Sequence, residues 1–544
     1  MPRQQFARKL FRSRTLRLST FLLSRRPVQS AAGKGETKPA METMESPVTT
    51  AASTGEAKPV IDSVLPTIAG LTDGEVYVQN LAENFISDGD MSAAGPASRE
   101  VLQKADDDLR DPNCDPDRPQ KLHFQEVSAA AYSIKSGITK TPLTLNRTLS
   151  EQYGMKVWFK KEFLQETGSF KERGARYTLL SLTPEQRSKG VIAASAGNHA
   201  LALCYHGAQL GIPVTVVMPV VAPLMKITRC RSYGANVIIQ GNDVSEARLA
   251  ALRLAQGSGA LYVNGYDYLN ILAGQGTLGL EILDELPNVD AIVVPIGGGG
   301  LIAGLATAVK TLKPDVQIIG VEAERCPGWT AALSAGRPVY TKPGSTLADG
   351  LSVPVVGGNS FATARDLVDR VLLVNEYDIA MAILRLVEME KAVVEGAGAV
   401  GFAALIAGHL DHLKGATVVF PLCGGNIDTT VLGRSLERGL AADGRLVRFA
   451  CVVSDRPGGI AEMAALLARC GASIKDIAHE RAWLRTDIFS VRVKVVAETR
   501  GWEHARELES LLREKFAKVI FEDNHTPSEY LSTGAKAAPC QDSD

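Results

Sequence analysis

The chain has 544 residues, of which 45% are hydrophobic and 22% are charged, as is usual for globular domains. Its 59 basic and 60 acidic residues give a formal net charge of −1, which argues against a general nucleic-acid binder. The eight cysteines form no C-x-x-C pair, so we expect neither a disulfide framework nor a zinc site. One uncharged stretch, residues 291–309, contains Pro295 and four consecutive glycines, so we do not expect it to span a membrane.

The first 30 residues carry eight arginines or lysines, no acid, and apolar residues that can share one face of a helix. This pattern predicts a mitochondrial transit peptide over residues 1–30 and a location in the mitochondrial matrix, with a cytoplasmic location as the alternative. Residues 31–119 are rich in Ser, Thr, Ala, Gly, Pro and acids. We interpret them as a mostly disordered linker.

Short β-rich runs alternate with helical segments over residues 120–440. Strands are predicted at 191–194, 214–218, 237–239, 261–263, 291–294, 317–321 and 418–421. Helices are predicted at 224–233, 244–256, 272–286, 301–312 and 427–440. The runs 214–218 and 292–294 are largely apolar rather than alternating, as in strands that are buried on both faces. The pattern predicts an α/β domain with a parallel sheet covered by helices, and a ligand site beyond the carboxyl ends of the strands.

A different pattern begins at residue 446. Strands are predicted at 447–454, 473–479, 488–496 and 519–522, and helices at 460–470 and 502–516. This order, βαββαβ, predicts a ferredoxin-like α+β domain over residues 446–522. Residues 523–544 are expected to form a flexible tail.

Three glycine-containing segments follow strands or open helices: residues 167–175, 195–199 and 297–301. Four glycines at 297–300 would let backbone N–H groups converge at a helix N-terminus and bind a phosphate, although a flexible turn is the alternative. The segment lacks the lysine of a G-x-x-x-x-G-K-[ST] loop, which argues against a nucleotide triphosphatase.

Lys171 is the candidate nucleophile. A single lysine is usually a surface residue, but this one follows Phe170 and lies between Gly168 and Gly174. A helix start disfavours the charged form of a lysine. A neutral amine is what the formation of a Schiff base requires.

The segments 169–175, 195–200 and 297–301 resemble, in order, those of the serine/threonine dehydratases. These are pyridoxal-phosphate (PLP) enzymes of the tryptophan-synthase-β fold, also called fold type II. Residues 347–350, Glu395 and residues 423–426 extend the resemblance, which covers about residues 122–440. The C-terminal unit resembles an ACT domain, a module that often binds amino acids as allosteric effectors.

The resemblance implies a PLP-dependent threonine/serine ammonia-lyase. Such an enzyme converts L-threonine to 2-oxobutanoate and L-serine to pyruvate, and releases ammonia. Lys171 would hold PLP as a Schiff base and then remove the Cα proton of the substrate. The residues expected to bind the cofactor are Phe170, Lys171, Asn198, Gly297, Gly298, Gly299, Gly300, Leu301, Gly350, Glu395 and Cys423. Those expected to bind the substrate are Ser195, Ala196, Gly197, Asn198 and His199.

Two departures from the relatives affect the prediction. Racemases of the family have a serine where this chain has Ala196, so we expect little racemisation. A divalent-cation site found in some relatives would begin at Glu322, but its later carboxylate position is Gly328, so we expect no metal. The alternatives are a serine racemase with eliminase side activity and an inactive amino-acid sensor with a PLP fold. An amino-acid effector at the turn 455–459 and a homo-oligomer, dimer or tetramer, complete the expected partners.

Overall fold

The computed structural model describes residues 109–482, 484 and 488–522. The predicted transit peptide, most of the predicted linker and the predicted tail lie outside these ranges. In the part that the structure describes, no helix combines the length and the apolar character needed to cross a membrane.

The α/β region contains two sheets rather than the single sheet that we expected. The larger sheet has the order β1-β2-β10-β7-β8-β9, with β1 antiparallel to β2 and the other neighbours parallel. Its strands are β1 (Leu143–Leu145), β2 (Lys156–Lys160), β7 (Ala291–Pro295), β8 (Gln317–Ala323), β9 (Arg370–Val374) and β10 (Thr417–Pro421).

The smaller sheet is parallel and has the order β5-β4-β3-β6. Its strands are β3 (Val191–Ala194), β4 (Val214–Met218), β5 (Asn236–Ile239) and β6 (Leu261–Tyr262). The prediction of one sheet was wrong. Among the described strands, the two-residue strand β6 pairs only with β3, so it forms the edge of a separate sheet. A local apolar pattern identifies a strand but does not identify its neighbour.

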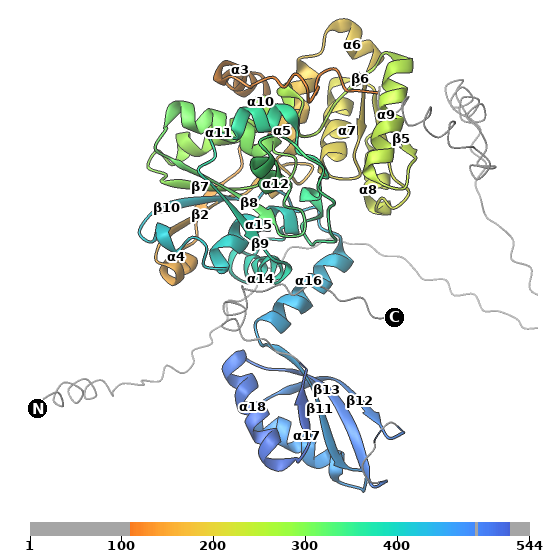
Figure 1. The fold of residues 1–544 in the computed structure, drawn as a ribbon, viewed down its shortest axis with the longest axis vertical. Helices are drawn as coiled ribbons and strands as arrows, with labels where there is room; N and C mark the ends of the chain where they lie inside the picture. The colour runs from red at the N-terminus through yellow and green to blue at the C-terminus, as the bar shows by residue number, and fades with distance from the viewer. Residues whose placement is uncertain (1–108, 483, 485–487, 523–544) are drawn as a thin grey trace, which may run out of the picture. The chain divides into compact units, whose positions relative to one another are not determined.

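Helices surround both sheets, as Figure 1 shows, with α7, α8 and α9 beside β5 and β6. The helices of this region are α3 (Phe124–Ile134), α4 (Arg147–Tyr153), α5 (Lys171–Leu180), α6 (Pro184–Lys189), α7 (Asn198–Leu210), α8 (Leu224–Ser232), α9 (Val244–Ser258), α10 (Leu269–Glu285), α11 (Gly300–Leu312), α12 (Gly328–Ala335), α13 (Gly358–Ala364), α14 (Glu376–Arg385), α15 (Gly396–Ile406) and α16 (Thr429–Ala442). Short helical turns are η1 (Glu162–Leu164), η2 (Asp349–Leu351), η3 (Leu386–Glu390) and η4 (Asp411–Leu413).

Strand β7 shows why the larger sheet reads as an uninterrupted apolar run. All five of its residues are buried. Val293 belongs to a core cluster on one face of the sheet, whereas Ile292 and Val294 belong to the cluster on the other face. A strand covered on both faces needs apolar residues at every position, as we predicted for this segment.

The C-terminal unit has the predicted βαββαβ order. Its elements are β11 (Leu446–Ser454), α17 (Gly459–Cys470), β12 (Ser473–Glu480), β13 (Ser490–Glu498), α18 (Trp502–Lys515) and β14 (Val519–Phe521), and the strand order is β12-β13-β11-β14. Strand β13 begins two residues later than predicted, because Ile488 and Phe489 extend the apolar pattern but are exposed. Alternate residues of β11, such as Phe449 and Cys451, are buried in the core of this unit.

Residues 109–119 do not behave as the linker that we expected. Asp111 and Cys114 are buried. The Asn359 side chain, which is in α13, donates to the carbonyl of Asn113 at 3.0 Å and accepts from the Gln120 N–H at 2.7 Å. The domain therefore begins earlier than the predicted boundary at residue 120.

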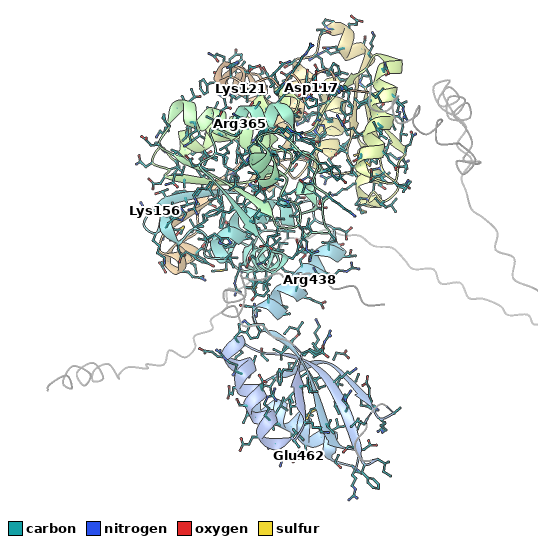
Figure 2. The ribbon with its side chains drawn as sticks, in the orientation of Figure 1. Asp117, Lys121, Lys156, Arg365, Arg438 and Glu462 are labelled. Atoms are coloured by element: carbon teal, nitrogen blue, oxygen red, sulfur yellow. The ribbon has the colours of Figure 1, made fainter. Side chains whose placement is uncertain are left out.

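Elsewhere charged residues such as Lys121, Lys156 and Glu462 are exposed (Figure 2).

Candidate active site

Lys171 is the first residue of α5, and the loop before it is fixed to the segment after β10. Ser169 forms a β-bridge with Gly424, and the Phe170 N–H donates to the carbonyl of Cys423 at 3.0 Å. The Gly425 N–H donates to the carbonyl of Gly168 at 2.9 Å. Two segments that are far apart in the sequence thus place the lysine at the carboxyl end of a central strand.

The Lys171 amine is held against the backbone of a third segment. Its Nζ donates to the carbonyl of Gly265 at 2.6 Å and lies 5.2 Å from the centre of the Phe170 ring. Burial lowers the pKa of Lys171 to about 8, while the Cys423 thiol and the Glu395 carboxyl act in the opposite direction. The sequence predicted a more neutral amine from the helix start, and the structure adds desolvation as the main cause.

Asn198 and Glu395, both predicted site residues, are hydrogen-bonded to each other, although Asn198 follows a strand of the smaller sheet and Glu395 precedes α15. Asn198 begins α7, after the loop 195–197 that follows β3, and its Nδ2 donates to Glu395 Oε1 at 2.6 Å. Asn426 Nδ2 donates to Asn198 Oδ1 at 2.9 Å and to the carbonyl of Thr167 at 2.7 Å. The amide of Asn198 is therefore fixed in orientation, and it lies close to the lysine loop.

Two acidic groups near the lysine are shifted towards their neutral forms. Burial raises the pKa of Glu395 to about 7, and the Asp349 carboxyl adds to this effect. Burial also raises the pKa of the Cys423 thiol well above its usual value. The site thus contains a carboxyl that titrates near neutral pH and a thiol that keeps its proton.

The four glycines 297–300 form a closely packed turn between β7 and α11. A Cβ atom on Gly298 would lie 2.3 Å from the Tyr266 ring, and one on Gly300 would lie 2.6 Å from the Tyr266 carbonyl oxygen. Gly299 has a φ of +96°, which favours glycine. The turn presents backbone N–H groups at the start of a 13-residue helix, as a phosphate requires. The Leu301 side chain is in the core, so this residue can contribute only its backbone.

The loop 195–199 has an open side and a closed side. No atom lies within 4 Å of a Cβ atom built on Gly197, and Ser195 Oγ accepts from the Gly197 N–H at 3.2 Å. Ala196 packs partly against the core of the smaller sheet. The His199 ring is buried, and its Nε2 lies 3.2 Å from the carbonyl of Val263. Nε2 is thus engaged by the backbone, whereas Nδ1 is buried without a hydrogen-bond partner among the described residues.

Gly350, the remaining predicted cofactor residue, lies in η2. A Cβ atom on it would lie 3.1 Å from Ala397 Cβ, and its neighbour Leu351 packs against Gly297. Gly265 and Tyr266 of this site escaped the sequence analysis, and Asn426 entered it only within the motif 423–426, without an assigned role. Gly265 and Tyr266 follow strand β6, and the rule that ligands lie beyond the carboxyl ends of parallel strands could have identified them.

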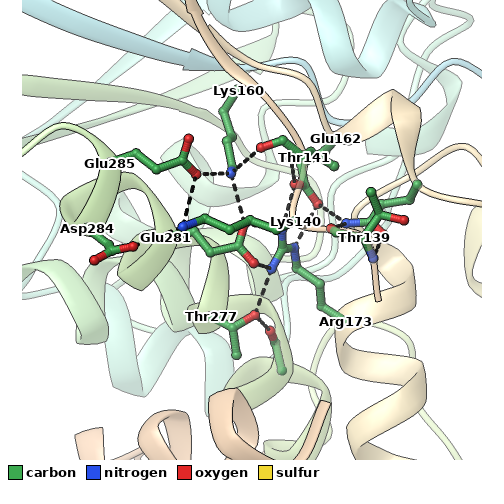
Figure 3. Close-up of polar contacts among 12 residues, drawn as sticks. Thr139, Lys140, Thr141, Lys160, Glu162, Arg173, Thr277, Glu281, Asp284 and Glu285 are labelled. Atoms are coloured by element: carbon green, nitrogen blue, oxygen red, sulfur yellow. Dashed lines mark hydrogen bonds and ion pairs between the residues drawn. The ribbon is translucent and has the colours of Figure 1, made fainter. Parts of the chain in front are cut away.

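A buried ionic network anchors the first turn of α5 (Figure 3). Arg173 donates to Glu162 at 2.7 and 2.8 Å and to Glu281 at 2.7 and 2.9 Å. Lys160 lies 2.8 Å from Glu281 and 2.9 Å from Glu285. The side chains of Lys160, Glu162 and Arg173 are completely buried. Since Arg173 is two residues from Lys171, the network holds α5 to η1 and α10.

The carboxylate of Glu322, where a cation site could begin, is used by helix α12. Glu322 accepts from the N–H groups of Trp329 and Thr330 at 2.6 and 2.9 Å and from Thr330 Oγ1 at 2.6 Å. Gly328 is the first residue of that helix. Both carboxylate oxygens therefore cap a helix.

Cys470, His504 and Glu507 are close enough together to be considered as metal ligands. However, His504 Nδ1 accepts from the Arg500 N–H at 3.0 Å, and Nε2 lies 2.8 Å from the Cys470 carbonyl oxygen. Both ring nitrogens are therefore engaged, Nε2 with the end of α17 and Nδ1 with the backbone that precedes α18.

Comparison with known proteins is consistent with this geometry. The family model described as "Pyridoxal-phosphate dependent enzyme" matches residues 134–424. An L-threonine ammonia-lyase of Thermotoga maritima is 42% identical over 398 residues, which are 73% of this chain and 99% of that protein. A catabolic L-threonine dehydratase of Staphylococcus aureus is 42% identical over 318 residues, 58% of this chain and 92% of that protein.

Solved structures show the same relationship. The processed form of threonine deaminase isoform 2 from Solanum lycopersicum is 34% identical with a TM-score of 0.55, covering 59% of this chain and 90% of that one. Maize serine racemase is 31% identical with a TM-score of 0.55, covering 59% of this chain and 98% of that one. Together with the lysine, the glycine turn and the paired amides, these similarities show that the chain belongs to the pyridoxal-phosphate-dependent serine/threonine dehydratase family.

Proposed function

We propose that this enzyme is a threonine/serine ammonia-lyase. It eliminates the β-hydroxyl of L-threonine or L-serine as water, and hydrolysis of the resulting imine takes up one water and releases ammonia with 2-oxobutanoate or pyruvate. The observation that carries the proposal is the position of the Lys171 amine, which has a lowered pKa and lies near Glu395 and Cys423, with Asn198 bonded to Glu395. Bound PLP supplies the electron sink that makes the Cα proton of an amino acid removable. The residues of the chain bind the reactants and move the protons.

Lys171 is the proposed anchor of the cofactor and the base that removes the Cα proton. Its pKa of about 8 raises the neutral fraction of the amine at physiological pH, and only the neutral amine can accept a proton. The Gly265 carbonyl accepts one N–H of the amine. This bond limits the directions in which Nζ can point.

The remaining groups fit a phosphorylated pyridine. The glycine turn 297–300 would hold the phosphate through backbone N–H groups at the start of a helix. These positions have no side chains of their own, because a Cβ atom on Gly298 or Gly300 would collide with Tyr266. Phe170 would pack beside the ring, and Asn198, with Glu395 behind it, would donate to the 3′-oxygen. Cys423 would face the ring nitrogen with a thiol that keeps its proton. Such a weak donor does not force a charge onto that nitrogen, which favours rapid elimination.

Binding of the substrate is assigned to the loop 195–199, with Ser195 and the loop backbone contacting the carboxylate. The side chain of Ala196 has no proton to donate. The face of the substrate opposite Lys171 therefore lacks an acid at this position, which favours elimination over racemisation. Serine racemase with an eliminase side activity remains the second candidate, because maize serine racemase has a similar structure.

The test is the release of 2-oxo acid from both amino acids, with chiral analysis of the remaining substrate. We expect Lys171→Ala to be folded and to retain less than about a thousandth of kcat, since one residue provides both anchor and base. Lys121→Ala, at an exposed lysine, is the matched control and should keep full activity. D-serine as the main product would favour the racemase, and a fully active Lys171→Ala would refute the assignment of the lysine.

We also infer that residues 446–522 form an ACT domain that binds an amino-acid effector. Their βαββαβ order supports this. So does a surface cavity of about 470 Å³ lined by Ser454, Arg456, Phe489 and Lys518, among others, whose two cations suit a carboxylate. Replacing Arg456 and Lys518 by alanine in the full chain should abolish the response of kcat or KM to isoleucine, valine or serine. An unchanged response would place the effector elsewhere.

Two further expectations remain proposals. Residues 1–30 are proposed to direct import into the mitochondrial matrix, which a fusion of these residues to a fluorescent reporter would test. A reporter that stays in the cytoplasm would contradict it. The enzyme is proposed to be a homodimer or homotetramer, and light scattering after size-exclusion chromatography would give its mass.

A further inference from the structure

The His199 side chain contacts the backbone segment that holds the catalytic lysine. The ring is buried, and Nε2 lies 3.2 Å from the carbonyl of Val263. Burial lowers the pKa of His199 to about 3, and the charge of Lys171 adds to this effect. The ring is therefore neutral, and because a carbonyl can only accept, Nε2 carries the hydrogen and donates it to Val263.

The same ring fills the space where residue 265 would have a side chain. A Cβ atom on Gly265 would lie 2.7 Å from both Cγ and Cδ2 of His199. The turn that follows is fixed by Asn264, whose Oδ1 accepts from the N–H groups of Tyr266 and Asp267 at 3.1 Å each. With the ring on one side and this turn on the other, the peptide group of Gly265 has little freedom to rotate.

The carbonyl of Gly265 is the acceptor for Lys171 Nζ at 2.6 Å. A lysine side chain has a flexible four-carbon stem, and its terminal amino group can rotate. The direction of the nitrogen lone pair therefore depends on what the N–H groups contact. A fixed acceptor removes part of that freedom once the amine is released to act as a base. An error of about 1 Å in such a position can cost about a hundredfold in rate.

We propose that His199 is a positioning residue for the reaction: its ring holds the Gly265 carbonyl in place, and this carbonyl orients the Lys171 amine. The inference deepens the proposed function and rests on the role assigned to Lys171. It gives the histidine of the loop 195–199 a task that is distinct from binding the substrate carboxylate. It also explains why residue 265 lacks a side chain.

The test compares two replacements of the ring in the PLP-loaded enzyme. His199→Gln keeps an N–H donor for Val263, whereas His199→Leu keeps bulk but removes the donor. We expect the leucine variant to lose about 10- to 100-fold in kcat with little change in KM, which marks the loss of an interaction made in the transition state rather than of substrate binding. The visible circular-dichroism band of the bound cofactor should change in the leucine variant, and glutamine should restore both the band and most of kcat.

A second pair of variants tests the contact itself. Gly265→Ala places a Cβ atom against the ring and should impair kcat and the dichroism band. Adding His199→Ala removes Cγ and Cδ2, so the double variant should be less impaired than the sum of the two single changes predicts. Cys204→Ala is the control for stability, since Cys204 is buried in the same helix and packs in the core of the smaller sheet.

Several results would contradict the inference or the function on which it rests. A leucine variant that keeps kcat and the band, or strictly additive Gly265 and His199 changes, would overturn the inference. His199 variants that lower the melting temperature but leave kcat and the dichroism band unchanged, as is expected of the Cys204 control, would overturn it too. Such a result would indicate a purely structural role. The role of Lys171 is checked separately by borohydride reduction of the wild-type holoenzyme and mass analysis of peptides. If the cofactor is not found on Lys171, the proposed function fails whatever the His199 variants do.

Discussion

Replacement of Arg173 by methionine tests whether the buried ionic network holds the catalytic helix. The Arg173 guanidinium makes four bonds of 2.7 to 2.9 Å to the carboxylates of Glu162 and Glu281, and the side chains of Arg173 and Glu162 are completely buried. Among the described residues, methionine would leave the Glu162 carboxylate with only Thr141 and Gln165 as side-chain donors. Removing one partner of a buried ion pair costs about 3 to 5 kcal/mol, since the other charge is left in a medium that solvates it poorly.

The chain provides both a control and a rescue. Lys140 and Asp284 form an ion pair at 2.9 Å, but their side chains are 54% and 74% exposed, so Lys140→Met should cost less than about 1 kcal/mol. Combining Arg173→Met with Glu162→Gln removes the buried Glu162 carboxylate that Arg173→Met leaves without its ion-pair partner. The double variant should therefore be more stable than Arg173→Met alone.

Thermal unfolding of the PLP-loaded protein measures these differences. For a large domain, about 2 °C of melting temperature corresponds to 1 kcal/mol, so we expect Arg173→Met to melt about 6 °C or more below the wild type. Because Lys171 lies in the same helical turn, the variant should also retain less bound cofactor. A melting temperature equal to that of Lys140→Met would refute the reasoning, as would a Glu162→Gln change that lowers the stability of Arg173→Met further.

Three further changes have defined outcomes. Gly298→Ala, whose Cβ would lie 2.3 Å from the Tyr266 ring, should weaken PLP binding about tenfold or more in an equilibrium titration. The control Gly433→Ala, with no atom within 4 Å of its Cβ, should bind PLP normally. Equal affinities of the two variants would contradict the assignment of the phosphate to the glycine turn 297–300. Ala196→Ser should increase D-serine formation relative to 2-oxo-acid release in a chiral assay, and the absence of D-serine would count against the missing acid. Burial raises the pKa of Glu395 from 4.5 to about 7, so its contribution to apoenzyme stability is present below about pH 4.5 and is lost as the pH rises to about 7. Urea midpoints of Glu395→Gln should vary less over this range than those of the wild type, and parallel curves would contradict the shift.

Much of the fold could be predicted because its signals are local. The apolar run 214–218 coincides with β4, and the run 191–194 coincides with β3. The site residues were predicted from motifs rather than from geometry. In the structure Glu395 and Cys423 lie close enough to Lys171 to affect its pKa, and Asn198 donates to Glu395.

The features that escaped prediction depend on distant partners. Arg173 is 108 residues from Glu281 in the sequence, and charges on a helix are usually interpreted as a solvated face. Asp111 and Cys114 lie in a polar segment that looks like a linker, yet both are buried. Gly265 looks like an ordinary turn residue. Its function depends on a contact with Lys171, 94 residues earlier in the chain.

The two groups of buried charges beside α5 differ in how they are neutralised. In the network, the Arg173 guanidinium is paired with the carboxylates of Glu162 and Glu281 at hydrogen-bonding distance. In the active site, burial instead shifts the pKa values of Lys171 and Glu395 to about 8 and about 7. Those groups can exchange protons near neutral pH, which the proposed elimination requires. Changes in the network should therefore alter stability first, whereas changes in the site should alter kcat and its pH dependence in a protein that remains folded.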